Sequence, residues 1–275
     1  MSARGLRAEL PTELLRNLTL RELRGKFKRS TLGWLWSIIN PAVNLAVYTV
    51  VFGVFLKVDP PEGDPSGLRE YGFFLVCGLL PWTFLTNGLS GSVGSLVENA
   101  GLIKKVYFPR AVLPTAVTLS MLASFAIELA VLGVALLVVG NMILPWLPVV
   151  LLLMALQLAF VLGLGLAISV LNAYFRDVQH FLGIALNVWF YATPILYPLN
   201  LVPTDSNVFG REIDLRAIVS MNPMHQFVEA YRTVLYDLRM PDAEQWTALT
   251  LFAVVSLLLG YAVFKRFEPN LAEEL

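Results

Sequence analysis

Charged and reactive side chains are scarce in this chain of 275 residues. Only 15% of its residues are charged and the net charge is zero, whereas about a quarter of the residues of a soluble domain are charged. The neutral balance gives no reason to expect a nucleic-acid partner. A single cysteine, Cys77, excludes an internal disulfide, and the two histidines, His180 and His225, stand far apart. We therefore expect neither a metal site nor a set of catalytic residues.

Two further signals are missing. Residues 1–33 are basic and polar without an early apolar run, so we expect no secretory signal peptide. Gly25-Lys26 is the only Gly-Lys pair, and Phe27 follows it where a phosphate-binding loop needs Ser or Thr. If ATP drives this protein, a second chain must bind the nucleotide.

Apolar sequence is abundant. Hydrophobic residues make up 57% of the chain and the mean hydropathy is +0.68, which indicates a polytopic membrane protein with an all-α fold. About 20 helical residues cross a bilayer core, and six segments approach or exceed that length. They are residues 34–56, 71–96, 111–139, 145–171, 181–197 and 246–264. In the fifth, Pro194 and Pro198 each remove a backbone donor, so we expect this helix to break before it leaves the membrane.

Lys and Arg are unevenly distributed between the connecting segments. Fourteen fall in residues 1–36, 97–110, 172–180 and the tail after residue 264, and six fall in the remaining segments. The positive-inside rule then places both termini in the cytoplasm, and an even number of spans agrees with that placement. The inner (plasma) membrane is the expected location.

The N-terminal segment contains a pattern typical of a helix start. Thr19 and Glu22 fit a capping box, with Leu18 and Leu23 placed as a hydrophobic staple. The pattern predicts a basic amphipathic helix from about Leu20 to Arg29 along the membrane surface; a simple topology anchor is the alternative. Its apolar residues are Leu20, Leu23 and Phe27, and its basic residues are Arg21, Arg24, Lys28 and Arg29.

Residues 97–110 combine apolar and basic residues in a short turn between two spans. Apolar side chains are costly in water unless something covers them, and a short helix with apolar anchors and flanking charge suits a groove on a partner protein. The candidate residues are Glu98, Asn99, Leu102, Ile103, Lys104, Lys105, Val106, Tyr107, Phe108, Pro109 and Arg110.

Three stretches resemble the permease subunits of ABC-2 type polysaccharide exporters, the family that exports O-antigen, teichoic acid, galactan and related lipid-linked glycans. They are residues 20–41 (LRELRGKFKRSTLGWLWSIINP), residues 99–114 including LIKKVYFPR, and YFRD at 174–177 followed by the fifth span and NPM at 222–224. The resemblance covers essentially the whole chain.

The resemblance implies an ABC-2 fold of the type V exporter kind, with a cytoplasmic segment (1–33) and a six-helix transmembrane domain (34–275). It implies a homodimer with two ABC ATPase subunits, which bind ATP and Mg²⁺, and a lipid-linked glycan as cargo. Glu98–Phe108 would be the coupling helix seated in the ATPase, Leu20–Arg29 the interface helix, and residues 198–243 would contain gate helices. This chain itself would be no enzyme and hold no cofactor.

Several residues inside the spans have a structural and a functional interpretation. Glu128 in the third span forms either a contact between helices or part of a pathway, since a charged carboxylate cannot face lipid cheaply. Gly88, Gly91, Ser92 and Ser95 indicate close helix packing. Aromatic residues of the first and fifth spans are either lipid-facing bulk or, as the resemblance suggests, the lining of a conduit for sugar rings: Tyr48, Phe52, Phe55, Trp189, Phe190, Tyr191 and Tyr197.

Residues 198–243 predict two short helices on the outer leaflet or dipping back into it. Asp214 can cap the first, over 215–221, and Asn222-Pro223 fits the start of the second. Phe227, Tyr231, Val234 and Leu235 form an apolar stripe. Met224, Phe227 and Tyr231 are gate candidates, with a statically packed lid as the alternative.

Two other functions remain open from the sequence. A permease for drugs or small lipids would share the six-span plan. An intramembrane enzyme or ion-coupled transporter is disfavoured, because the spans hold one carboxylate and no paired catalytic residues.

Overall fold

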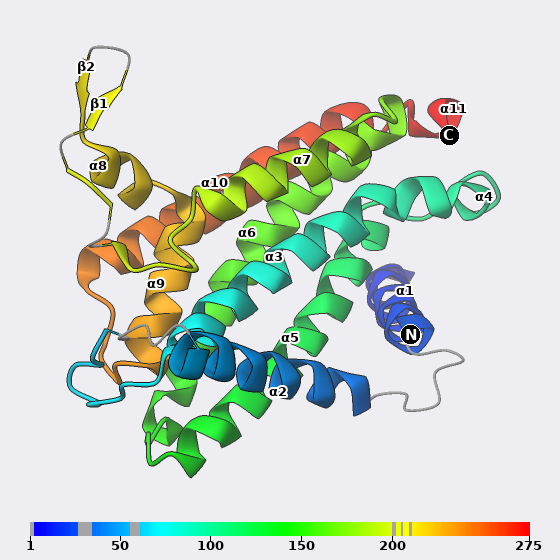
Figure 1. Ribbon diagram of the computed structural model, residues 1–275. Coiled ribbons are helices and arrows are strands. Elements are labelled where there is room, and N and C mark those ends of the chain that lie inside the picture. Colours follow the sequence, from blue (N-terminus) through cyan, green and yellow to red (C-terminus); the bar gives the residue numbers. More distant parts are fainter. Residues whose placement is uncertain (1–2, 27–34, 56–60, 200–201, 205, 209–210) are drawn as a thin grey trace.

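The computed structural model describes residues 3–26, 35–55, 61–199, 202–204, 206–208 and 211–275. At residues 3–11, 37, 206–208 and 211–213 it describes the backbone alone. Over this part the chain is a helical bundle with one short β-hairpin (Figure 1). Its elements are α1 (Ala3–Lys26), α2 (Trp36–Tyr48), a π-helix (Thr49–Phe55), α3 (Tyr71–Glu98), α4 (Ala100–Ile103), α5 (Val112–Val138), a 3-10 turn (Leu144–Trp146), α6 (Leu147–Tyr174), α7 (Val178–Tyr191), β1 (Ser206–Val208), β2 (Arg211–Ile213), α8 (Leu215–Ser220), α9 (Pro223–Leu235), α10 (Ala243–Phe267) and α11 (Leu271–Glu274).

In the part of the chain that is described, five helical segments are long and apolar enough to cross a membrane. They are Ile38–Phe55, Tyr71–Glu98, Val112–Val138, Leu144–Tyr174 and Ala243–Phe267. These match the first, second, third, fourth and sixth predicted spans, although the predicted ends of the first, Trp34 and Leu56, lie outside the described residues.

The fifth predicted span, residues 181–197, is shorter than expected. α7 has 14 residues, which corresponds to about 21 Å of helix at 1.5 Å per residue and falls short of a hydrocarbon core of about 30 Å. It ends at Tyr191 because Pro194 lacks an N–H and clashes with the preceding turn. The predicted break is confirmed. Because it comes this early, the length of α7 alone does not establish a sixth membrane-spanning helix.

Helix α3 is the centre of the bundle and packs against α2, α5, α6, α7 and α9. Its small residues allow this: a Cβ on Gly88 would lie 2.6 Å from Val161 Cγ1, and one on Gly91 would lie 2.6 Å from Val117 Cγ1. Ser92 Oγ is 3.2 Å from Thr118 Oγ1 on α5. The small-residue face predicted for this span therefore serves helix packing.

Helices α6 and α10 cross with their backbones in contact. A Cβ added to Gly260 would overlap the carbonyl oxygen of Gly163 and lie 2.8 Å from its Cα. Beside this crossing, Ser256 Oγ donates a hydrogen bond of 2.7 Å to the carbonyl oxygen of Phe160. Glycine is required at both positions because any side chain would force the helices apart.

The two ends of the bundle differ in what they carry (Figure 1). At one end lie α1, the turn that contains α4, and α11 with the C-terminus. At the other lie the hairpin of β1 and β2, α8 and the turn between α5 and α6. The sequence placed the N-terminal segment, the 97–110 turn and the C-terminus on one side, and the arrangement agrees.

The predicted start of the N-terminal helix at Leu20 is wrong. α1 runs without interruption from Ala3 to Lys26, and Thr19 Oγ1 donates to the carbonyl oxygen of Leu15 at 2.8 Å instead of capping a new helix. A Thr inside a helix bonds backward in this way, and its capping pattern is then accidental. The helix continues because Leu18 is buried against the bundle.

Helix α1 packs against α5. Lys26 Nζ donates to Ser124 Oγ at 2.9 Å, and Lys26 and the partly buried Glu128 attract each other electrostatically. Glu128 is therefore close enough to Lys26 for the two charges to interact, which fits the structural interpretation; its role stays a prediction. Three predicted members of the interface helix, Phe27, Lys28 and Arg29, lie outside the described residues.

The second helix of the 198–243 region dips into the bundle. Its predicted start is confirmed, since Asn222 Oδ1 accepts from the backbone N–H of Met224 at 3.0 Å, and Asp214 caps α8 through Ala217 N at 3.0 Å. α9 packs against α3, α6 and α10. The gate candidates Met224, Phe227 and Tyr231 are fully buried, because their apolar stripe is covered by three helices. This packing fits the packed-lid alternative, and the gate role stays a prediction.

Candidate functional site

The turn between α3 and α5 is held firmly at its base. Asn99 ends α3, and its Nδ2 donates to the carbonyl oxygen of Ser95 at 2.8 Å. Arg21 of α1 donates from Nη2 to Asn99 Oδ1 at 2.9 Å, which joins the predicted interface helix to the predicted coupling segment. The backbone N–H groups of Leu102 and Ile103 both donate to the carbonyl oxygen of Asn99, at 2.9 and 3.0 Å.

The predicted coupling helix Glu98–Phe108 is not one helix. α3 includes Glu98, and α4 covers only Ala100–Ile103. The chain then turns at Lys104 and Lys105, and Val106–Pro109 form no regular structure. Pro109 keeps Phe108 out of a helix, because the residue before a proline is disfavoured in the helical region.

The apolar residues of this turn divide into two groups. Ile103 is buried, and Leu102 and Phe108 pack against the same apolar cluster, formed by the ends of α3, α5, α6 and α10. Val106 is half exposed and the side chain of Tyr107 is completely exposed. The chain therefore covers its own anchors and leaves one aromatic tip in solvent.

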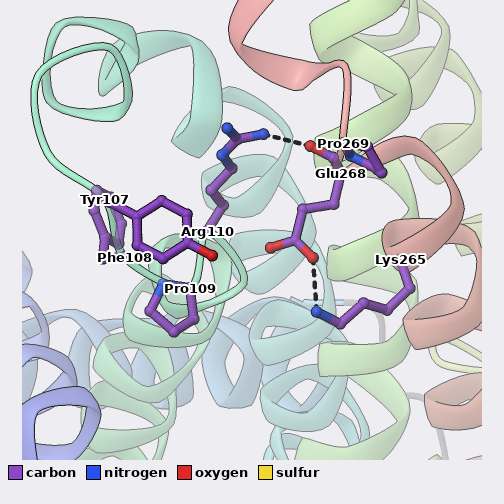
Figure 2. Close-up of a pocket in the computed structure, with 7 residues that line it drawn as sticks. All are labelled: Tyr107, Phe108, Pro109, Arg110, Lys265, Glu268 and Pro269. Carbon is purple, nitrogen blue, oxygen red and sulfur yellow. Dashed lines mark hydrogen bonds and ion pairs between the residues drawn. The ribbon is translucent and has the colours of Figure 1, made fainter. Parts of the chain in front are cut away.

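Beside this tip is an open cleft of about 390 Å³, lined by Tyr107, Phe108, Pro109, Arg110, Lys265, Glu268 and Pro269 (Figure 2). Arg110 donates from Nη1 to the carbonyl oxygen of Glu268. The Glu268 carboxylate forms an ion pair of 2.7 Å with Lys265 Nζ. The 97–110 turn and the C-terminal end of α10 thus form one surface.

The C-terminal end was not expected on this surface from the sequence. Tyr174 Oη donates to the carbonyl oxygen of Phe267 at 2.9 Å, and Leu271 of α11 is fully buried. Backbone carbonyls accept most of these bonds, and they leave no mark in a sequence. The spacing of Leu271 from the charged Lys265-Arg266 pair is the only available hint of a docked tail.

The predicted conduit aromatics lie in two segments that flank α3: α2 with the π-helix after it on one side, and α7 with the residues after it on the other (Figure 1). Tyr48 and Phe52 are partly buried, and Phe52 stacks on Tyr71 with ring centroids 5.1 Å apart. Phe55 is largely exposed. The sequence placed all three on one α-helical face, but Thr49–Phe55 is a π-helix, so the expected spacing does not hold there.

On α7 the aromatics also divide. Trp189 and Phe190 contact Trp82 of α3, with ring centroids 6.0 and 5.5 Å apart. Tyr191 is largely exposed, and Tyr197 Oη donates to its carbonyl oxygen at 3.1 Å. Phe55 and Tyr191 are therefore the two conduit candidates whose side chains are free of the bundle.

One buried cation was misjudged from the sequence. Arg232 was counted as a charge of an extracytoplasmic loop, yet it lies on α9 and is almost completely buried. Its guanidinium donates to the carbonyl oxygens of Phe74, Pro194 and Ile195, at 3.3, 2.8 and 2.6 Å. An arginine within an apolar stripe after Asn-Pro was the signal that could have drawn attention to it.

The fold and this surface define a class of protein. Residues 13–236 match the family of ABC-2 type transporters, and the chain belongs to that family. It is a multi-pass membrane protein, whose apolar helices surround α3 as described above.

Individual relatives match along almost the entire chain. An O-antigen export system permease protein of Myxococcus xanthus is 33% identical over 269 residues, covering 95% of both chains. A protein of the same description from Klebsiella pneumoniae is 28% identical over 264 residues, covering 96% of this chain and 95% of the relative. A polysialic acid transport protein of Escherichia coli is 26% identical over 263 residues, covering 91% and 92%. These relatives are named as permease and transport proteins.

Proposed function

We propose that this chain is the transmembrane permease of an ATP-driven exporter of lipid-linked polysaccharide in the inner membrane, with both termini in the cytoplasm. Two copies form the conduit and two ABC ATPase subunits, carrying ATP and Mg²⁺, supply the energy. O-antigen, teichoic acid and galactan are glycans of the proposed class. The relatives named above transport O-antigen and polysialic acid by their descriptions, which favours this cargo over the alternative of drugs or small lipids.

The observation that carries the ATPase partnership is the exposed Tyr107. Leaving a large apolar side chain in water forgoes about 1.5–3 kcal/mol relative to burying it. Three other apolar residues anchor this turn, because Ile103 is buried and Leu102 and Phe108 pack against the same cluster, while Val106 is half exposed. A rigidly supported aromatic tip beside an open cleft is the arrangement found at the centre of protein interfaces, where tyrosine is enriched.

The charges around the tip suit the same partner. Lys104 and Lys105 are exposed on one side, and Lys265 with Glu268 lies on the other side of the cleft (Figure 2). A groove on the ATPase with an apolar floor for Tyr107 and an acidic rim for the two lysines would complement this surface. This chain has no phosphate-binding loop of its own, so the ATPase must come from a second chain.

The dimer is supported by the uncovered flanks of α2 and α7. Of the candidate spans, Ile38–Phe55 has the smallest share of buried residues. Val43, Val47 and Val54 are exposed on it, and Phe181, Ile184 and Val188 are exposed on α7. A second copy packed against these flanks would enclose Phe55 and Tyr191 between the subunits, where aromatic planes can stack on sugar rings.

The ATPase surface can be tested by binding. The permease is co-expressed with the ABC ATPase encoded beside it, and the affinity of the two purified subunits is measured. Tyr107→Asp should weaken binding by about 30-fold, the effect of losing one interfacial hot spot of about 2 kcal/mol. Met142→Asp is the matched control, because Met142 is also an exposed apolar residue but lies in the turn at the opposite end of the bundle. Equal binding by the Tyr107 variant and the wild type would refute the proposed docking surface.

The cargo needs a separate test in cells. Deleting the permease should leave completed lipid-linked glycan in the cytoplasmic leaflet and remove it from the cell surface, as seen by lectin labelling of intact and permeabilised cells. Normal surface glycan together with increased drug sensitivity would support the alternative cargo. This test is independent of Tyr107, so failure of one assignment leaves the other intact.

A further inference from the structure

The chain is not helical just after α7, yet this segment lies inside the bundle. Backbone groups at membrane depth must be hydrogen-bonded within the protein, because lipid offers no partners. Each carbonyl from Trp189 to Leu196 has a donor. The donors are Thr193 Oγ1, Thr193 N, Tyr197 Oη, Asn222 Nδ2, Ile195 N, Arg232 Nη1, Arg232 Nη2 and Tyr71 Oη, in chain order. We call residues 192–197 the α7 extension.

Arg232 supplies the two central bonds of this set. It reaches Pro194 O at 2.8 Å and Ile195 O at 2.6 Å, two neighbouring carbonyls of the α7 extension for which the donor is a side chain rather than a backbone N–H. The same guanidinium is anchored on α3, because its Nε donates to Phe74 O at 3.3 Å and its carbon lies 3.8 Å from the centre of the Phe74 ring.

The site is shaped for a guanidinium. A Cβ on Gly78 would lie 2.9 Å from Arg232 Nη2, so a glycine on α3 makes room for the group. The only carboxylate within ion-pair distance in the described residues is that of Glu229, at 3.9 Å, and Glu229 is partly exposed. A planar fork that donates along several directions fits three carbonyls and an aromatic face, whereas a lysine ammonium is a point charge.

Helix α9 holds the same extension a second time, at its other end. Asn222 Nδ2 donates to Thr193 Oγ1 at 2.9 Å, and Trp189 Nε1 donates to Asn222 Oδ1 at 2.8 Å. Asn222 and Arg232 stand at the start and near the end of α9. The broken end of α7 is therefore bonded to both ends of one buried helix.

We infer that Arg232 is a positioning residue that locks the α7 extension to α9 and α3, so that α7 with its aromatic residues can shift only together with α9. The lock explains why a charged side chain is kept in the bundle, where an unpaired charge would cost several kcal/mol. The inference concerns the interior of one subunit and does not depend on the proposed cargo or ATPase.

Cys77 provides a built-in reporter. It is completely buried and lies on α3 between Phe74 and Gly78, two α3 residues that lie against Arg232. A thiol reagent can reach it only when this region opens, and the labelling rate follows the population of the open form. The purified full-length protein in detergent is treated with N-ethylmaleimide, and the rate of Cys77 modification is followed by mass spectrometry.

Arg232→Met should raise the labelling rate at least about ten-fold, since three charge-assisted hydrogen bonds are lost. Arg232→Lys should behave more like Arg232→Met than like the wild type, because it keeps the charge and loses the fork. Arg239→Met, which removes an exposed cation beyond the same helix, should leave the rate unchanged.

Leu113→Ala separates local opening from general destabilisation. Leu113 is buried in the cluster at the opposite end of the bundle, so this variant lowers stability without touching the extension. A wild-type labelling rate in Arg232→Met would overturn the inference. The inference would also be overturned if Leu113→Ala, compared at equal distance below its own unfolding temperature, raised the labelling rate as much as Arg232→Met does. A wild-type labelling rate in Arg232→Lys would overturn it as well.

Discussion

The crossing of α6 and α10 gives a prediction whose size follows from the geometry. Replacing Gly260 by Ala adds a Cβ that would lie 2.5 Å from the carbonyl carbon of Gly163 and 2.8 Å from its Cα. Ordinary van der Waals contact begins at 3.4 Å. No side chain can rotate out of the way, because the obstacle is backbone. The two helices must separate by about 1 Å, and a gap of this size forfeits a quarter to a half of the dispersion energy of the atoms that face it.

The separation also acts on the neighbouring hydrogen bond. Ser256 Oγ is 2.7 Å from the carbonyl oxygen of Phe160, and lengthening this buried bond by about 1 Å removes it, at a cost of about 1 kcal/mol. Overpacking of a core adds about 1–3 kcal/mol. We therefore expect Gly260→Ala to lower the free energy of unfolding by about 2–4 kcal/mol.

The measurement is thermal unfolding of the purified protein in detergent, compared with Gly183→Ala. Gly183 lies inside α7, and a Cβ there meets no atom within 4 Å in the described structure. Since Ala is favoured over Gly in a helix by up to about 1 kcal/mol, this control should be neutral or stabilising. If Gly260→Ala unfolds at the wild-type temperature, the backbone contact does not exist and the packing of α6 on α10 is misplaced.

Two further predictions concern residues that flank α9. Asn222→Ala should lower the free energy of unfolding by about 2 kcal/mol, because it removes the cap of α9 and the side-chain bonds to Trp189, Ala192 and Thr193. Asn222→Asp keeps the cap and should lose less in the same unfolding assay. Equal losses by the two variants would contradict the role in capping. Burial, and then the nearby Glu229 charge, raise the pKa of Asp237 from 3.8 to about 6. Between those pH values the folded protein holds a proton that the unfolded chain releases, so stability should fall as the pH rises from 4 to 6, by about 1 kcal/mol after solvent screening. Asp237→Asn should remove this slope, and an unchanged slope would assign it to another group.

The membrane-spanning helices were predictable because lipid imposes a simple rule. Spans such as 111–139 and 145–171 need only enough apolar residues in a row, and the structure places α5 and α6 there. The end of α7 was predictable for a similar reason, since Pro194 acts on the backbone whatever surrounds it.

Local patterns with two solutions were less informative. Thr19 can cap a new helix or bond back to Leu15, and only the burial of Leu18 against the bundle decides between them. Likewise Tyr48, Phe52 and Phe55 share a face only if the helix is α-helical, and the π-helix at Thr49–Phe55 changes the spacing. In both places the packing of the helix against the rest of the bundle determines which local structure forms.

The site was foreseen in part. The apolar and basic residues of the 97–110 turn marked the right segment, but the sequence could not separate the anchors Leu102 and Ile103 from the exposed Tyr107. That division depends on which side of the turn meets α5 and α10. Arg232 was missed because its partners are backbone carbonyls, which every residue carries and no sequence pattern identifies.

The glycine contact between α6 and α10 has a mechanical consequence. Packed helices usually adjust to one another when the side chains between them change rotamer, which permits shifts of about 1–2 Å. Where Gly163 meets Gly260 there are no side chains to rearrange, so this pair is a stiff frame. Motion within one subunit must then be carried by its neighbours, above all by α2 and α7, whose outer flanks are uncovered. A force applied at Tyr107 is transmitted to α3 and α5, the helices that the turn connects, and these helices would move relative to the fixed pair of α6 and α10.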